Sequence, residues 1–579
     1  MIQIKINGEW VETYPGTSLK YVFNSAAFSD KAIVGDFSYS LSFPDSDNNA
    51  LIFGFISNPD LYNHTSQHNC ELYEQNNLMV SGVFKITKAV KGDKISGNFI
   101  NSAYDFKGQI ENMTTKDLDL GGDHEFLIQS EFDAYILAMM NGSYPDYKFA
   151  QFPVLNETYL DGTPEEDNWQ SILYINPYNP GGNDVYYPYL AYIIEQLFAK
   201  FGYNISSNTI AEHLELKKLC LIGLLEDTHV VEYTGYNLHY HVLKVDLNKL
   251  LESIKSTLGI SFFFSHKSKG VSMGFLKDLL VSGNYVDWTD KIIGKLSKVV
   301  DSNDTGYVLS HSFDSTDTTI SEMQLPDGIF DNAVIETAVL LPADLPDYAN
   351  MGIHAGEIRK VICEDMYYII VDIDPEPTLD HQWTKLTWNF FGKVVGDALN
   401  EKQSLLTTLG MNWHSKKLGG DSYRNGWMTP HSDQVLLTKP VTGTLGMLVP
   451  GNQNYGLAEA LVNDFEPRVL FFRNMRPDAV DVDYPLGTSG KYDAKGNLIG
   501  TLTLNWDGAD GLYINFWKDW LKFIDEGIPM EASVNLDLLD ILKLDTRKQI
   551  KIGNNFYLLK KLTIDYPIEK AATAEIVRV

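Results

Sequence analysis

Residues 1–130 alternate apolar and polar side chains with the two-residue period of a β-strand. The alternation is clearest in residues 36–43, where aromatic or aliphatic side chains alternate with serine. Two further short apolar runs, 83–87 and 94–100, flank a turn sequence at 91–93 and predict a hairpin. The pattern predicts a small antiparallel β-barrel or sandwich, and a helical interpretation is weak here.

Residues 131–182 are rich in aromatic residues, Asn, Pro and Gly and lack a lasting period, so we predict a connector. A helix follows, beginning near Pro188 and ending at Gly202, which can adopt the left-handed conformation of a helix end. Its apolar residues recur with helical spacing: Leu190, Ile193, Ile194, Leu197, Phe198 and Phe201.

A second helix is predicted between Asp246 and Gly259. The Asp246 carboxylate can accept hydrogen bonds from the first-turn amides, and Gly259 favours termination. The apolar face contains Leu247, Leu250, Leu251, Ile254 and Leu258. Residues 260–264 continue as a predicted strand, so residues 183–300 are predicted to be α+β.

The last part of the chain is again rich in predicted strands, and a polar, Gly-rich stretch near 410–455 predicts an exposed excursion. An amphipathic helix ending at Gly527 carries an aromatic stripe: Tyr513, Phe516, Trp517, Trp520, Leu521 and Ile524. We interpret this stripe mainly as core packing, and a docking surface for a partner is the alternative. Residues 550–552 and 558–564 flank a turn at 553–555 and predict a C-terminal hairpin.

These patterns predict a mainly β fold with an α+β middle. We divide the chain into an N-terminal β domain (1–130), a connector (131–182), an α+β domain (183–300) and a second β-rich domain (301–579) with a possible exposed insertion near 380–455. No repeat is visible in the sequence, but the two β-rich regions could share a fold.

Composition and charge narrow the function. The 579 residues are 44% hydrophobic, which is enough apolar material for several cores. The net charge of −30 disfavours nucleic-acid binding, which depends on clustered Lys and Arg. No secretory signal and no membrane-spanning segment are predicted. Cys70, Cys220 and Cys363 form neither a disulfide framework nor a metal motif, and they fit assembly in a reducing cytoplasm.

Several groups of residues are candidate metal-binding sites. On a strand, His239 and His241 would share a face and could form a metal pair, but a third ligand is not evident. Residues 301–306 and 45–49 are faintly similar to calcium loops but lack the bidentate Glu, and we interpret them as solvated turns.

Two carboxylate groups could form a glycosidase pair, which requires a separation that sequence does not supply. They are Asp161, Glu165, Glu166 and Asp167 in one segment, and Asp372 and Asp374 in another. In so acidic a chain we interpret both as chance clusters. Nucleophile-elbow, phosphate-loop and dinucleotide motifs are absent. We therefore predict a non-enzymatic protein with no catalytic, cofactor-binding or metal-binding residues.

Three segments, in their shared order, resemble structural proteins of phage tails. Residues 35–44 with Asn48-Asn49 resemble the opening of structural proteins of Bacteroides-type phages and prophages. Residues 187–203 with 250–260 are similar to the middle domain of tail hub proteins. Residues 511–520, 536–545 and 552–558 look like the end of the same proteins.

The resemblance implies two small antiparallel β-barrel-like domains joined by an α+β domain. It also implies a homotrimer whose six barrels form a ring-shaped hub at the tail tip. The hub would contact the tail tube or distal tail protein on one face and a central spike or fibre on the other. Tape-measure protein and DNA would pass through its lumen without specific binding, and an acidic lumen would suit this passage. The protein is then expected in the virion tail after assembly in the host cytoplasm.

Alternatives remain open at this stage. The aromatic surplus of 32 Tyr, 29 Phe and 10 Trp would suit a receptor-binding or carbohydrate-active tail protein, although fibre or β-helix repeats are not seen. A hub with a fused peptidoglycan-cleaving module and a hub-like part of a contractile secretion apparatus are further alternatives.

Overall fold

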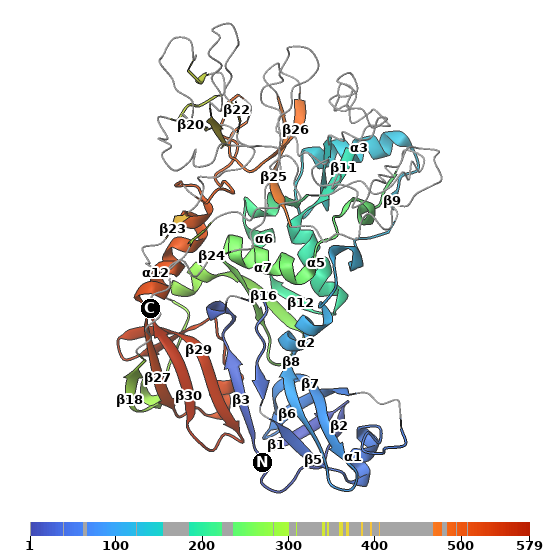
Figure 1. Cartoon of the computed structure of the whole chain (residues 1–579), viewed down its shortest axis with the longest axis vertical. Coiled ribbons are helices and arrows are strands. Elements are labelled where there is room, and N and C mark those ends of the chain that lie inside the picture. The colour runs from blue at the N-terminus through green and yellow to red at the C-terminus, as the bar shows by residue number, and fades with distance from the viewer. Residues whose placement is uncertain are drawn as a thin grey trace, which may run out of the picture.

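A computed structural model describes most of the two ends and the middle of the chain. The described ranges are 2–153, 184–299 and 467–579, apart from 30, 39, 62–65, 123, 223–234, 282, 478–482, 494 and 507, together with short pieces between 308 and 405. The protein is mainly β, with 40% strand against 26% helix, as the sequence predicts. A layer of β-sheet lies below a mixed α and β region, and both chain ends lie in the β layer (Figure 1).

The N-terminal β unit contains eight strands and a short helix. These are β1 (Ile2–Ile6), β2 (Glu9–Trp10), β3 (Leu19–Asn24), β4 (Phe37–Ser38), β5 (Leu41–Pro44), α1 (Asp47–Ile52), β6 (Gln67–Glu74), β7 (Asn77–Val90) and β8 (Lys94–Asn101). The predicted hairpin is confirmed, because β7 and β8 pair across the turn at 91–93. The predicted continuous strand 36–43 is divided into β4 and β5, which both lie beside β8.

The C-terminal β unit contains six strands and a short helix. These are β17 (Tyr285–Asp287), β18 (Ile292–Lys298), β27 (Ile528–Val534), α13 (Leu538–Leu542), β28 (Gln549–Ile552), β29 (Asn555–Tyr566) and β30 (Ala572–Arg578). The predicted C-terminal hairpin is confirmed as β28 and β29, with Gly553 at φ 59° in the turn. Because β17 and β18 pair with β28 and β27, this unit combines residues from both sides of 299–527.

The two β units share one order of elements. β5, α1, β6, β7 and β8 in the first unit correspond to β27, α13, β28, β29 and β30 in the second. In both units the strand before the short helix pairs with the last strand, and the long strand pairs with those before and after it. Both long strands also carry an irregularity, at Ile86/Lys88 in β7 and at Leu559/Lys561 in β29. The described strands form an open sheet rather than a closed barrel.

The region above the β layer joins helices to small sheets. Its helices are α2 (Ser102–Gln109), α3 (Gln129–Met140), α5 (Leu190–Lys200), α6 (Thr209–Glu212), α7 (Leu247–Leu258) and α12 (Lys518–Glu526). Its strands include β9 (His124–Glu125), β10 (Phe149–Pro153), β11 (Asp184–Pro188), β12 (Asn204–Ser207), β13 (Leu219–Leu221), β14 (Gly235–Tyr236), β15 (Ile260–Phe264), β16 (Gly270–Phe275), β25 (Val469–Pro477) and β26 (Asp483–Thr488). Short strands between 308 and 405 are β19 (Val308–Leu309), β20 (Ile358–Val361), β21 (Met366–Ile369), β22 (Thr384–Lys385), β23 (Val394–Val395) and β24 (Ser404–Leu405).

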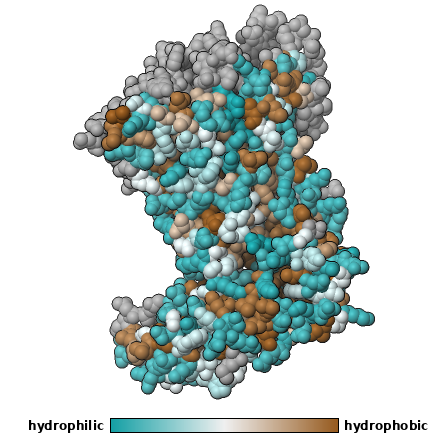
Figure 2. Space-filling view, turned by 180° about the vertical axis from the view of Figure 1, so that it is seen from behind, coloured by the Kyte–Doolittle hydropathy of each residue, from teal (hydrophilic) through white to brown (hydrophobic). Residues whose placement is uncertain are grey.

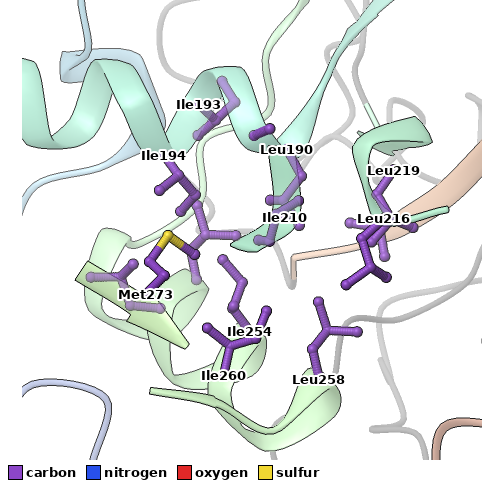
Figure 3. Close-up of a cluster of buried hydrophobic side chains, with 14 of the residues drawn as sticks. Leu190, Ile193, Ile194, Ile210, Leu216, Leu219, Ile254, Leu258, Ile260 and Met273 are labelled. Atoms are coloured by element: carbon purple, nitrogen blue, oxygen red, sulfur yellow. The ribbon is translucent and has the colours of Figure 1, made fainter. Parts of the chain in front are cut away.

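Both predicted helices of the middle region are confirmed. α5 begins two residues after Pro188, with Tyr189 at its N-cap, and Gly202 adopts φ 71° just beyond its end. In α7 the Asp246 side chain accepts a hydrogen bond from the Lys249 amide, and Gly259 ends the helix at φ 61°. The apolar faces of these helices meet side chains from neighbouring elements in one buried cluster (Figure 3). The cluster includes Leu190, Ile193, Ile194, Ile210, Leu216, Leu219, Ile254, Leu258, Ile260 and Met273.

The predicted aromatic helix begins with a π-helical turn, η9 (Tyr513–Trp517), and continues as α12. Core packing is confirmed for most of its stripe, since Phe516, Trp517 and Trp520 are buried. The wider π turn shifts the phase of the stripe. Phe523 is therefore buried, whereas Ile524, which the 3.6-residue period places in the stripe, is 40% exposed. The prediction for Ile524 is wrong for this reason.

Candidate assembly surface

The two β units are joined by one strand-to-strand seam. β3 lies between β4 of its own unit and β29 of the other unit. β29 and β3 run antiparallel, with register Lys561↔Asn24 to Tyr566↔Leu19. This pairing makes one 14-stranded sheet from strands more than 500 residues apart in sequence. Seen from behind, apolar residues gather near the middle of the β layer, with polar residues around them (Figure 2).

The seam has an aromatic core. Tyr21 of β3 is fully buried, and its ring centroid lies 4.7 Å from Phe23, 5.9 Å from Phe99 and 6.3 Å from Tyr566. Burial raises the pKa of Tyr21 and of Tyr566 well above the ordinary value, so both phenols stay neutral. Both hydroxyls lack a hydrogen-bond partner among the described residues. The seam is therefore stabilised mainly by burial and ring contacts.

Two buried carboxylates link the seam to its surroundings. Glu74 of the N-terminal unit accepts hydrogen bonds from the Ile568 amide of the C-terminal unit at 3.0 and 3.3 Å. Asp36 accepts from the Asn24 amide at 2.7 Å, and its other oxygen lies 2.6 Å from His266 Nδ1 in the middle region. These carboxylates hold parts of the chain together, which is a structural role.

The outer ends of the sheet differ sharply from the seam. β18 pairs with β27, but its Ile293 is 49% exposed and the following Val299 is 41% exposed. At the other side of the layer the sheet path ends at β2, and β7 continues to Val90, beyond Lys85, the last residue that pairs with β6. Sheet edges present unpaired backbone donors and acceptors, which makes them natural places for another chain to bind.

His239 and His241 do not form the metal pair that a strand would allow. They lie in a 3-10 turn (Leu238–His241), not on a strand that would place both rings on one face. His241 accepts a hydrogen bond from the Tyr186 amide at 3.3 Å and packs 4.5 Å from the Tyr186 ring. Burial, with Lys116 as the second cause, lowers the pKa of His241 to about 3. Across the described ranges, no group of three His, Cys, Asp or Glu side chains could hold a metal ion.

Polar side chains of the 45–49 segment form hydrogen bonds with nearby backbone groups. Asp45 accepts from the Ser57 hydroxyl at 2.9 Å and the Gly92 amide at 2.7 Å, and Ser46 caps α1. Asn49 is fully buried, donates to the Glu12 and Pro44 carbonyls, and accepts from the Glu12 amide. The other candidates (301–306, Asp161, Glu165, Glu166, Asp167, Asp372 and Asp374) lie outside the described residues, as does most of 380–455.

A buried ion pair in the upper region is also structural. Arg473 of β25 is fully buried and donates to Glu215, to the Gly490 carbonyl at 3.0 Å and to the Leu502 carbonyl at 2.9 Å. Burial lowers the pKa of Arg473, while Glu215 opposes that change. The guanidinium thereby ties three separate segments together. None of the helices in the described part of the chain is long and apolar enough to cross a membrane.

Comparisons with known proteins give matches among solved structures. The chain matches no protein-family model and no curated protein. Among solved structures it is similar to the 43 kDa tail protein of prophage MuSo2 from Shewanella oneidensis, with 6% identity and a TM-score of 0.33 over 100% of this chain and 98% of that one. It is also similar to a tail protein from Neisseria meningitidis MC58, with 7% identity and a TM-score of 0.31 over 100% and 96% of the two chains. Scores this low do not by themselves show a shared fold.

The seam between β3 and β29 has no local signal in the sequence. β3 and β29 look like ordinary amphipathic strands, and nothing local states which strand each one pairs with. The correspondence of the two units does have a signal in the sequence. Both β-rich ends contain a capped short helix followed by a hairpin with a long second strand, and an alignment of the caps and turns of these elements superposes the two units.

Proposed function

We propose that this protein is a structural component of a phage tail tip, where it forms a ring-shaped hub. One observation carries the proposal: two β units with the same order of elements are joined edge to edge within one chain. A contact that joins the C-terminal unit to the N-terminal unit within a chain can be repeated between chains. Such a head-to-tail contact closes into a ring when the rotation per step divides a full turn.

The size of the ring follows from the sequence resemblance. Three copies would supply six β units, which matches the sixfold symmetry of a tail tube. The partners would then be the tail tube or distal tail protein above and a central spike or fibre below. The lumen would pass tape-measure protein and DNA, and the net charge of −30 would limit binding of a sliding polyanion.

The proposed mechanism is binding at subunit interfaces rather than catalysis. Four of the buried charged groups hold backbone segments together: Asp36 and Glu74 at the seam, and Arg473 with Glu215 in the upper region. The geometry of these groups supports a structural role.

The mass of the purified protein in solution, measured by light scattering together with negative-stain images, tests this proposal. We expect a species of about three times 65.3 kDa that shows a ring with a central hole. A monomer at every concentration, also in the presence of tail tubes, would overturn the hub. An elongated trimer that binds host-surface glycan would instead favour the receptor-binding alternative.

A further inference from the structure

The pairing within the two units gives β18 and β3 the same position. In the first unit, β4 and β5 together take the place that β27 takes in the second unit. β3 pairs with β4, and β18 pairs with β27. β1 and β17, which precede them in sequence, pair with β6 and β28, the strands before the long strand, although β1 runs antiparallel to β6 and β17 runs parallel to β28. β3 and β18 are therefore corresponding strands of the two units, and β7 and β29 are corresponding long strands.

The corresponding strands differ in what covers their second edge. β3 has β4 on one side and β29 on the other, and most of its residues are buried. β18 has β27 on one side, and most of its residues are exposed. Among the residues that the structure describes, no strand pairs with its other side.

The long strands show the complementary difference. In β29 the side away from β30 is covered by β28 at Asn555–Leu558 and by β3 at Lys561–Tyr566. In β7 the side away from β8 is covered by β6 up to Lys85, and the Ile86 amide donates to the Ser66 carbonyl. No described strand pairs with that side of residues 87–90.

We infer that β18 of one copy pairs with residues 87–90 of β7 in a second copy, and that this pairing repeats between chains the β3–β29 seam within each chain. The inference rests on the proposed ring, whose subunit contact it specifies. β18 and the N-terminal unit lie at opposite sides of the β layer, as a head-to-tail contact requires (Figure 1).

The outward backbone groups can be assigned from printed hydrogen bonds. The Val299 amide donates to the Pro529 carbonyl, so the neighbouring Lys298 amide points away from β27. The Val90 carbonyl accepts from the Asp93 amide in the turn to β8, so the neighbouring Ala89 amide points away from β8. Lys298 and Ala89 are thus the positions where proline would remove a donor from the proposed pairing.

Both edges carry lysines, Lys295 and Lys298 on β18 and Lys85 and Lys88 on β7. Lysines on an edge strand discourage pairing with unintended strands. They also repel each other across the proposed contact. Because salt screens exposed charges, assembly is expected to strengthen as ionic strength rises.

Two proline variants of the full chain test the pairing, measured by analytical ultracentrifugation. Lys298→Pro and Ala89→Pro each remove one outward donor at an edge, where proline is tolerated. We expect each variant alone to associate at least tenfold more weakly than the wild type. Lys298→Ala keeps the amide and removes one of the repelling charges, so this control is expected to assemble at least as strongly as the wild type. Circular dichroism and thermal unfolding of each variant check that the monomer is folded.

Mixing the two variants tests the direction of the contact. The intact β18 of Ala89→Pro can still pair with the intact β7 of Lys298→Pro, so a dimer of about twice 65.3 kDa is expected and a ring is not. If the wild type forms a ring and both proline variants retain it, the strand pairing is wrong while the hub survives. If the wild type forms no ring under any condition, the hub proposal fails first.

Discussion

The N-terminal and C-terminal β units use the same order of strands but place different connections between them. In the first unit, residues 25–36 join β3 to β4; in the second, residues 299–527 lie between β18 and β27. The sheet tolerates both, because the ends of neighbouring strands stay close whatever the loop contains. The order and pairing of the strands in a β unit can therefore be retained while a long segment is inserted between two neighbouring strands.

The units also differ at the corresponding strands β3 and β18. β3 is covered on both edges and β18 on one, which makes the first a core strand and the second a surface strand. The corresponding strand thus lies inside the sheet in the N-terminal unit and at the edge of the sheet in the C-terminal unit. Substitutions in the two units and in the region between them can break or sharpen this comparison.

Tyr21→Ala in the covered strand should lower the free energy of unfolding by about 3–5 kcal/mol, because a fully buried aromatic ring is lost. Tyr21→Phe should be neutral or slightly stabilising, since the buried hydroxyl has no described partner. Val299→Ala in the surface position should change monomer stability by less than about 0.5 kcal/mol. Urea unfolding measures all three, and equal losses at 21 and 299 would contradict the assignment.

The short helices of the two units allow a matched pair of substitutions, because Asn49 and Asp540 each lie three residues after the N-cap. Asn49→Ala should cost about 2–3 kcal/mol, since it leaves the Glu12 and Pro44 backbone groups without their partner. Asp540→Ala should cost about 1 kcal/mol, because its ion pair with Lys291 is partly exposed. Only the second loss should shrink at high salt.

The α+β region between the units should respond to acid through His241. Its folded pKa of about 3 lies below the ordinary value, so between pH 6.5 and 3 the unfolded chain binds the proton and the folded chain does not. Stability contributed by neutral His241 is therefore lost as the pH falls through this window. From pH 7 to pH 5 the wild type should lose about 2 kcal/mol more than His241→Asn, which keeps an acceptor for the Tyr186 amide. Equal losses in urea unfolding would show that His241 is protonated in the fold.

Small losses of stability are expected at the helix caps. Ser46→Ala and Asp537→Ala should each cost about 1 kcal/mol, because each side chain accepts a hydrogen bond from a first-turn amide. Asp537 should cost slightly more, since its charge favours the helix N-terminus and Lys291 lies 3.7 Å away. Thermal unfolding of both variants checks the order, and a larger loss at Ser46 would contradict it.

Features that are encoded locally were predictable. α7 is predicted by Asp246 at its N-cap, by the helical spacing of its apolar residues and by Gly259 at its end, all within one short segment. The C-terminal hairpin is likewise encoded by its Gly-Asn turn. α3 was missed because Ile128 stands at its N-cap and Leu137 remains 41% exposed, so neither a capping signal nor a clean apolar face marks it. The fold class depended on such local signals and was largely recovered.

The candidate assembly surface depends on pairing between strands that are distant in sequence, so it was not predictable from the sequence. Nothing in residues 19–24 specifies 561–566 as their partner, because alternating burial suits many strands equally well. The contact between Asp36 and His266 also joins residues that are remote in sequence. The roles of β3 and β18 become distinguishable only when their neighbours in space are known.

The most direct test of the account is a cryo-EM reconstruction of the assembled protein. We predict a threefold ring of six β lobes in which N-terminal and C-terminal units alternate. Strand density should be continuous at both kinds of seam, β3 with β29 inside a chain and β18 with β7 between chains. A ring whose copies touch only through the α+β region, with both sheet edges facing solvent, would contradict the account.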